Sequence, residues 1–174
     1  MRKVLYILGQ LSDVDVAWLA RAGTRKRHPI GTVLIRYGVA LDSLFIILDG
    51  AISIRTNRGF ELASVGAGEV LGEMSFVDSR PPSASAVVTS DAYVLAIEKT
   101  VIQSKLEADT GFASRFYRAV AIFMSERMRD QVGRMGYGDA PEDPADEDEL
   151  DANVLDNVHL AGARFERLLT ALMG

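Results

Sequence analysis

The sequence has no cysteine, no long apolar run and no strongly basic character, and each absence excludes a class of protein. Without cysteine, the 174-residue chain can form no disulfide, no thiolate nucleophile and no cysteine-ligated zinc site. No apolar run approaches the ~20 residues of a membrane-spanning helix. The N-terminus lacks the hydrophobic length and the cleavage site of a signal peptide. We therefore expect a cytoplasmic protein that does not associate with membranes.

The negative charge of the chain is concentrated in one segment. The formal net charge is −5, yet residues 139–151 (DAPEDPADEDELD) hold eight acids and no base. The remaining 16 acids and 19 bases leave the rest of the chain at +3. A strongly basic surface for nucleic acid is therefore absent. Proline and repelling charges favour an extended chain, so we interpret residues 138–151 as a solvated linker, with an acidic docking tail as the alternative.

Between Thr24 and Lys99 the pattern is typical of short strands. Turn residues separate the runs at 8–12-residue spacing, which indicates a sandwich or a roll. The best hairpin turns are Asp49-Gly50 and the segment 57–59 (Asn-Arg-Gly). The predicted strands are TVLIRY, SLFIILDG, AISIRT, ELASVG, SASAVVTS and AYVLAIEK.

Helices are predicted on both sides of this region. Residues 12–22 read as a helix with Ser12 as its N-cap and Gly23 at its end. A short helix is predicted over 99–109 and a long one over 111–135. Trp18 lies on the stripe of the first helix and is interpreted as a core residue.

The long helix carries two apolar stripes. A single small roll cannot cover both stripes, so we interpret the second as a homodimer surface. Burial of both by the same chain is the alternative. The first stripe is Phe112, Phe116, Ala119 and Phe123, and the second is Tyr117, Ala121, Met124, Met128 and Met135.

The C-terminal residues 152–174 form the third unit, after residues 1–137 and the linker 138–151. Apolar residues recur over 152–172 at helical spacing, which predicts an amphipathic helix. Its apolar face could pack on the same chain, on a second subunit or on a different protein.

One stretch, GEVLGEMSFVDSRPPSASAVV (68–88), combines features that suit a phosphate and a sugar. Gly72 permits a tight turn, and residues 74–77 can form one helical turn whose free N–H groups favour an anion. The Glu73 carboxylate suits a ribose hydroxyl, although it could also cap its own turn. Ser83 and Ser85 are predicted to share one face of the next strand.

The sequence shows no catalytic motif. His28 and His159 are isolated, and neither has metal-ligating neighbours at a useful spacing. The sequence contains no nucleophile elbow and no Walker loop. We therefore do not expect an enzyme.

The order of elements resembles the cyclic-nucleotide-binding domain, the family of the protein kinase A regulatory subunits and the catabolite-activator transcription factors. The resemblance covers about residues 8–135. DSLFIILDGAISI (42–54) is similar to the family's central hairpin with Gly50 at its turn, and 68–88 is similar to its phosphate-binding cassette. The resemblance implies an eight-stranded β-roll with flanking helices.

The resemblance also implies a ligand site, with one departure. The implied residues are Gly72, Glu73, Met74, Ser75, Ser83, Ala84 and Ser85. The cassette Arg, which pairs with the cyclic phosphate in this family, is replaced here by Pro82. Such a pair is worth ~1.5–3 kcal/mol. Arg80 is interpreted as a surface residue that does not replace it, so binding of cAMP or cGMP is predicted to be weak or lost, and another small anion is an alternative ligand.

These features predict a stand-alone regulatory or sensor protein that forms a homodimer through 111–135. The transcription-factor members follow the long helix with a helix-turn-helix, whereas this chain follows it with acids and one helix, which argues against DNA binding. The alternative is a ligand-free interaction module that docks a partner through residues 152–172.

Overall fold

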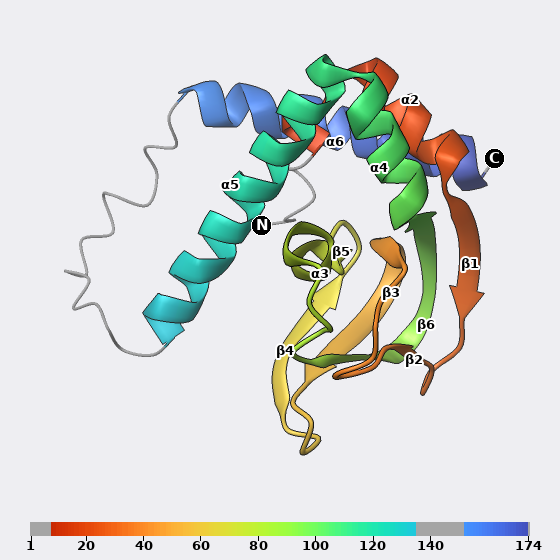
Figure 1. Ribbon diagram of the computed structural model, residues 1–174, viewed down its shortest axis with the longest axis vertical. Coiled ribbons are helices and arrows are strands. Elements are labelled where there is room, and N and C mark those ends of the chain that lie inside the picture. The colour runs from red at the N-terminus through yellow and green to blue at the C-terminus, as the bar shows by residue number, and fades with distance from the viewer. Residues whose placement is uncertain (1–7, 135–151, 174) are drawn as a thin grey trace.

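The computed structural model describes residues 8–134 and 152–173 (Figure 1). Strands form a roll, and helices gather over one end of it, with α5 extending away to one side (Figure 1). The predicted linker 138–151 lies outside the described residues. The elements are α2 (Asp13–Ala22), β1 (Thr24–His28), β2 (Val33–Ile35), β3 (Ser43–Arg55), β4 (Glu61–Gly66), β5 (Val70–Leu71), α3 (Glu73–Asp78), β6 (Ser85–Glu98), α4 (Lys99–Ala108), α5 (Thr110–Arg134) and α6 (Ala152–Met173).

The six strands in the described part of the chain form one antiparallel sheet that curls into the roll. Its order is β1-β6-β3-β4, with β2 also paired to β6 and β5 to β3. The fold is therefore mainly β with flanking helices, as predicted, but the strand number differs from the predicted eight. Two pairs of predicted runs are each one long strand, namely 43–50 with 51–56 and 83–90 with 92–99.

The predicted hairpin turn at Asp49-Gly50 is wrong, because β3 continues through it. Gly50 has φ +93°, and a Cβ there would lie 2.4 Å from the Asp91 carbonyl oxygen of β6. The pairing of β3 with β6 shifts register around Asp49 and Ala51 and then resumes. Gly50 is therefore a bulge that bends two paired strands together, and a bulge and a turn share the same sequence signal.

The second predicted turn is confirmed. Segment 57–59 joins β3 to β4, where the Thr56 N–H donates to the Phe60 carbonyl at 2.9 Å and Gly59 has φ +87°. This hairpin extends from the roll on the side opposite the helices (Figure 1).

Strand β3 is apolar on both of its faces because it separates two cores. Leu44, Ile46 and Leu48 pack with the helices, whereas Phe45 and Ile47 pack inside the roll. Successive side chains of a strand point to opposite faces, so a continuous apolar run is what such a position requires.

The predicted cap of the first helix is confirmed. Ser12 accepts from the Asp15 N–H at 3.2 Å, and Asp15 Oδ2 accepts from the Ser12 N–H at 2.7 Å, which makes a capping box. Gly23 ends the helix in an extended conformation, and a Cβ there would lie 2.5 Å from Leu95. Trp18 is partly buried and packs edge-on against the core residue Phe112, with centroids 5.2 Å apart, so it packs at the edge of the core.

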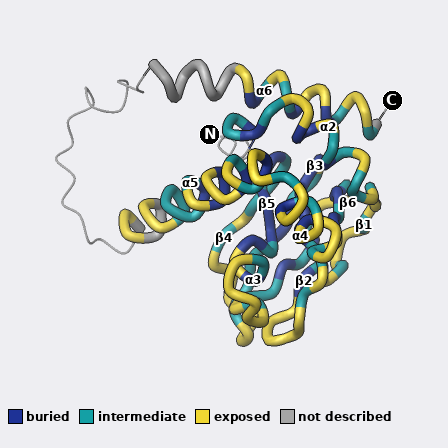
Figure 2. Tube along the Cα trace, turned by 45° about the horizontal axis from the view of Figure 1, so that its top comes forward, coloured by how far each residue is buried: buried dark blue, intermediate teal, exposed yellow. Residues whose placement is uncertain are grey.

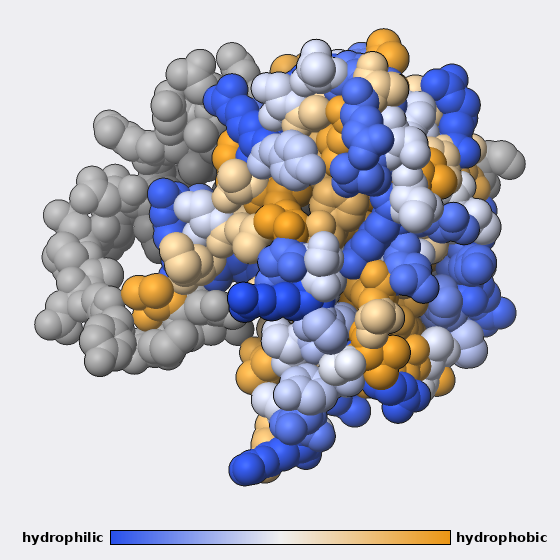
Figure 3. Space-filling model, in the orientation of Figure 1, coloured by the Kyte–Doolittle hydropathy of each residue, from blue (hydrophilic) through white to orange (hydrophobic). Residues whose placement is uncertain are grey.

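The two stripes of α5 differ in burial. The four residues of the first stripe are at most 2% exposed. In the second stripe, Tyr117 is 47% and Met128 63% exposed, while Met135 lies outside the described residues. Figure 2 shows this contrast along α5, and hydrophobic atoms follow its visible face in Figure 3. The described part of the chain thus covers the first stripe and leaves most of the second uncovered.

Helix α6 folds back on its own chain. It lies beside α2 (Figure 1), and Ala161, Phe165 and Leu168 are at most 2% exposed in the main core. Arg164 donates to Asp13 at 2.7 Å and to the Leu8 carbonyl at 3.0 Å. Of the three possible positions, the structure shows the first. The described apolar face is covered, which leaves the docking-helix alternative without support.

Candidate functional site

The turn before α3 can be made only by glycine. Gly72 has φ +91°, and a Cβ there would lie 2.7 Å from Leu41 Cδ2 and 3.0 Å from the Ser43 carbonyl oxygen. The Gly72 carbonyl accepts from the Phe76 N–H at 3.0 Å and so begins α3. The predicted helical turn is confirmed, with bounds at Glu73 and Asp78.

The seven predicted site residues all line one cavity of about 230 Å³, which we call the inner cavity. It lies between α3, the segment that leads into β6, and the roll. The structure thus brings together residues 72–75 and 83–85, as the cassette pattern requires. The remaining lining residues are Ile35, Ile54, Leu71, Asp78, Arg80, Pro81, Pro82, Ala86 and Arg127.

Of the two serines predicted on the next strand, Ser85 lies on it and Ser83 does not. Strand β6 begins at Ser85, so Ser83 lies in the turn before the strand and not on it. The Ser85 hydroxyl accepts from the Tyr37 N–H at 3.0 Å and therefore also fixes the segment after β2. The adjacent prolines delay the strand because neither can donate to a ladder.

Glu73 is buried and paired. Its side chain is 3% exposed, and it accepts a hydrogen bond from Arg127 Nη1 of α5. Burial raises the pKa of the Glu73 carboxyl, although Arg127 and the backbone N–H groups of Glu73 and Gly72 act in the opposite direction. The carboxylate thus joins α3 to α5.

The position of the family's Arg carries no side-chain donor. The Pro82 carbonyl accepts from the Gly38 N–H at 2.9 Å, which any residue could do. In the part of the chain that the structure describes, Arg80 and Arg127 are the cationic residues that line the inner cavity. The Arg80 side chain is 84% exposed and lies 3.9 Å from Asp78, which agrees with a surface residue.

Arg127 lines the inner cavity, although no sequence pattern predicted it there. It lies 54 residues after Glu73 and between the two apolar stripes of a long helix. An arginine at such a position is ordinary on a solvated helix, so no local signal distinguishes it. Only the packing of α5 against α3 brings it to the inner cavity.

The described residues include no group of three His, Cys, Asp or Glu that could hold a metal ion. His28 Nε2 is buried without a hydrogen-bond partner, and burial lowers its pKa. None of the helices that the structure describes has the length and apolar character to cross a bilayer.

A family model for the cyclic nucleotide-binding domain matches residues 25–109. The cAMP-dependent protein kinase type II regulatory subunit of Drosophila melanogaster is 32% identical over 93 residues, which cover 52% of this chain and 25% of that protein. Glutaminase 2 of Bradyrhizobium diazoefficiens is 29% identical over 92 residues, which cover 53% of this chain and 14% of that protein.

Solved structures agree with the family model. A cyclic nucleotide-binding domain from Methylobacillus flagellatus KT is similar with a TM-score of 0.69 at 24% identity, over 76% of this chain and 80% of that one. This likeness shows the fold. The segments matched in curated relatives cover 14% to 36% of those proteins, so what is shared is one domain of each.

Proposed function

Because this chain belongs to the cyclic nucleotide-binding domain family through residues 25–109, we propose that it is a regulatory protein whose inner cavity senses a small anionic ligand. The related kinase subunit is named for regulation by cAMP, and a cyclic nucleotide is the first candidate ligand. The observation that carries the proposal is the convergence of all seven cassette residues on one cavity.

The Glu73–Arg127 pair supports a mechanism for reporting the ligand. Ribose hydroxyls donate hydrogen bonds, and the acceptor placed for them, Glu73, already accepts from Arg127. The inner cavity, at about 230 Å³, is also smaller than the ~300 Å³ at which small-molecule sites usually begin. A nucleotide whose ribose donates to the Glu73 carboxylate would therefore compete with Arg127 for that carboxylate and displace it. Since Arg127 belongs to α5, ligand binding would shift that helix.

The substitution at Pro82 supports weak binding of ordinary cyclic nucleotides. The missing charge-assisted bond is worth ~1.5–3 kcal/mol, which corresponds to roughly 10- to 150-fold in affinity. Arg80 is largely solvated, and Arg127 is engaged by Glu73. Arg127 can replace the family's Arg only by releasing the buried Glu73, and Arg80 only by giving up its solvation.

Isothermal titration with cAMP and cGMP tests this proposal on three proteins. The wild-type chain should bind weakly, and Pro82→Arg should bind at least roughly tenfold more tightly. Pro29→Arg, which adds the same charge in an exposed turn, is the matched control and should behave as wild type. Micromolar or tighter binding by the wild type, or an equal gain from both variants, would overturn the role assigned to Pro82.

A homodimer through α5 completes the proposal. Tyr117, Met128 and Val132 are 47%, 63% and 43% exposed and lie on one side of the helix. Two subunits would bury this stripe against each other. A ligand-dependent movement of α5 in one subunit would then change the interface with the other.

Light scattering after size-exclusion chromatography measures the dimer directly. Met128→Glu should produce a monomer. Leu160→Glu, at a residue that is 51% exposed on α6, should leave the mass unchanged. A wild-type monomer at high micromolar concentration would contradict the dimer while leaving the ligand proposal intact.

A further inference from the structure

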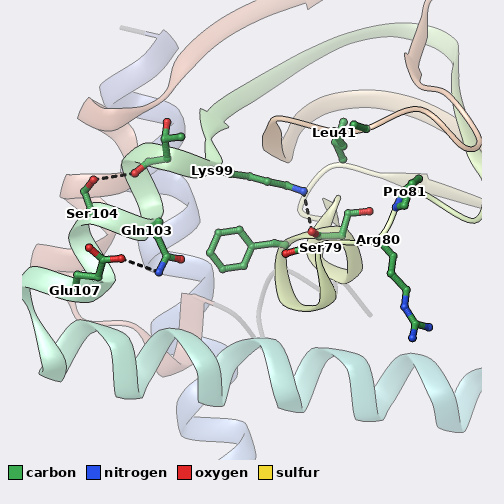
Figure 4. A pocket seen from close by; sticks show the side chains of 12 residues that line it. Leu41, Ser79, Arg80, Pro81, Lys99, Gln103, Ser104 and Glu107 are labelled. Carbon is green, nitrogen blue, oxygen red and sulfur yellow. Dashed lines mark hydrogen bonds between the residues drawn. The ribbon is translucent and has the colours of Figure 1, made fainter.

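A second cavity lies on the other side of α3, between that helix and α4, and we call it the outer cavity. Its volume is about 530 Å³, more than twice that of the inner cavity. Figure 4 shows α4 along one side and the segment after α3 on the other. Its lining residues are Ala40, Leu41, Ser75, Phe76, Ser79, Arg80, Pro81, Lys99, Thr100, Gln103, Ser104 and Glu107.

The polar face of α4 forms one wall. Its five lining residues recur at helical spacing and so share a face, while Ile102 and Leu106 are buried in the core on the other. Two of the polar side chains are satisfied within the helix. Gln103 donates to Glu107 at 3.0 Å, and the Ser104 hydroxyl donates to the Thr100 carbonyl at 3.0 Å.

Lys99 is different because it reaches across the cavity. Its Nζ donates to the Ser75 carbonyl of α3 at 2.9 Å (Figure 4), which uses one of the three N–H groups of the ammonium. Burial lowers the pKa of Lys99, and the charges of Asp42 and Asp78 only partly oppose this effect. An anion in the cavity would therefore stabilise the charged lysine and use its remaining donors.

The opposite wall supplies apolar surface. Leu41, Phe76 and Pro81 line it with Ala40, and Ser79 and the largely solvated Arg80 line the same side. Glu107 lies at the far end of α4 from the Lys99 ammonium (Figure 4). The outer cavity thus has a cationic end, an acidic end and an apolar wall, and a volume within the usual range for small-molecule sites.

We propose that the outer cavity binds a small amphipathic acid, whose carboxylate or phosphate contacts Lys99 and whose apolar body packs on Leu41 and Phe76. The site does not depend on a ligand in the inner cavity. Because Ser75, Arg80 and Pro81 line both cavities, α3 and the segment after it form the wall between them.

The test is a titration of the 15N-labelled full chain with phenyl phosphate, followed by amide shifts. Inorganic phosphate and benzyl alcohol serve as probes that carry only the charge or only the ring. Phenyl phosphate should shift the amides of Lys99, Thr100 and Gln103 in a saturable manner and bind roughly fivefold or more tightly than either fragment. Shifts confined to Gly72 and Glu73 would place the ligand in the inner cavity and overturn the proposal.

Two substitutions change the affinity in opposite directions. Lys99→Met should weaken phenyl phosphate at least about fivefold, through the loss of a charge-assisted hydrogen bond. Glu107→Gln should strengthen it about twofold, because it removes a repelling charge. The matched control is Arg58→Met, in the β3–β4 turn, which should leave the affinity unchanged.

Lys99→Met also removes the bond to Ser75, so a further variant separates the two roles. Ser104→Trp leaves Lys99 intact and fills the cavity from an exposed position of α4. It should abolish the shifts while its circular dichroism remains that of the wild type. Unchanged phenyl phosphate binding in a folded Ser104→Trp protein would overturn the assignment.

Discussion

Two carboxylates, each 3% exposed, join α5 to the rest of the molecule, and their surroundings differ. The Asp15 carboxylate accepts two hydrogen bonds from Arg115, at 2.7 and 3.0 Å, and a third from the Ser12 N–H at 2.7 Å. Glu73 accepts from Arg127 across the inner cavity. Arg115 and Arg127 lie twelve residues apart on the same helix.

The pKa values of the two groups move in opposite directions. Burial alone would raise the pKa of Asp15, but Arg115 and Ser12 lower it below its usual value of 3.8. For Glu73, burial dominates and raises the pKa above 4.5 despite Arg127. The Asp15–Arg115 pair thus stabilises the fold. In the Glu73–Arg127 pair the buried carboxylate is less well stabilised, so a ligand that donates more hydrogen bonds to Glu73 would stabilise it further.

Arg127→Met should have the largest effect on the free energy of unfolding. It leaves the Glu73 carboxylate buried without its cation, which should cost about 2–4 kcal/mol at pH 7, given that Arg127 is partly exposed. The cost should shrink toward pH 5, because protonation of Glu73 removes the orphaned charge. Urea unfolding at both pH values measures it.

The control for this variant is Arg129→Met, which breaks an ion pair whose arginine is 74% exposed. Its effect should stay below about 0.5 kcal/mol. Equal destabilisation by the two variants would mean that the Glu73–Arg127 pair stabilises the protein no more than an exposed ion pair does.

Asp15→Ala should rank second, at about 1–3 kcal/mol, because it removes a two-pronged pair and a helix cap. The pKa of Asp15 is lower in the folded state than in the unfolded state, so its contribution is complete above pH 3.8 and is lost as the pH falls through the folded value. The difference from wild type should therefore persist at pH 5, where that of Arg127→Met has shrunk. If the difference in unfolding free energy between Asp15→Ala and the wild type had already disappeared at pH 5, the structural role of Asp15 would be refuted.

Glu73→Gln should have the smallest effect, about 1 kcal/mol or less, because a neutral amide avoids the burial cost and retains hydrogen-bonding groups. The raised pKa of Glu73 makes the wild type lose stability as the pH rises from 4.5 through the folded value. The variant should lack this component. Unfolding at pH 5 and pH 8, with Glu126→Gln as the control, measures the difference in slope.

Local signals predicted much of the fold. The capping box at Ser12, the helices over 99–109 and 111–135 and the turn at 57–59 follow from patterns within a few residues. The misread turn at Asp49-Gly50 shows the limit of such signals. A glycine bulge is distinguished from a hairpin by the strand beside it, and Asp91 lies 41 residues away.

The candidate site divides in the same way. The sequence alone determined the cassette, because the constraints on Gly72 and on residues 73–85 act between close neighbours and appear as residue types. Tertiary structure alone decided that Arg127 pairs with Glu73, that α6 packs against α2 and that a second cavity lies between α3 and α4. Those features depend on side chains far apart in the chain that meet only when whole helices pack, and periodicity does not specify which helix faces meet.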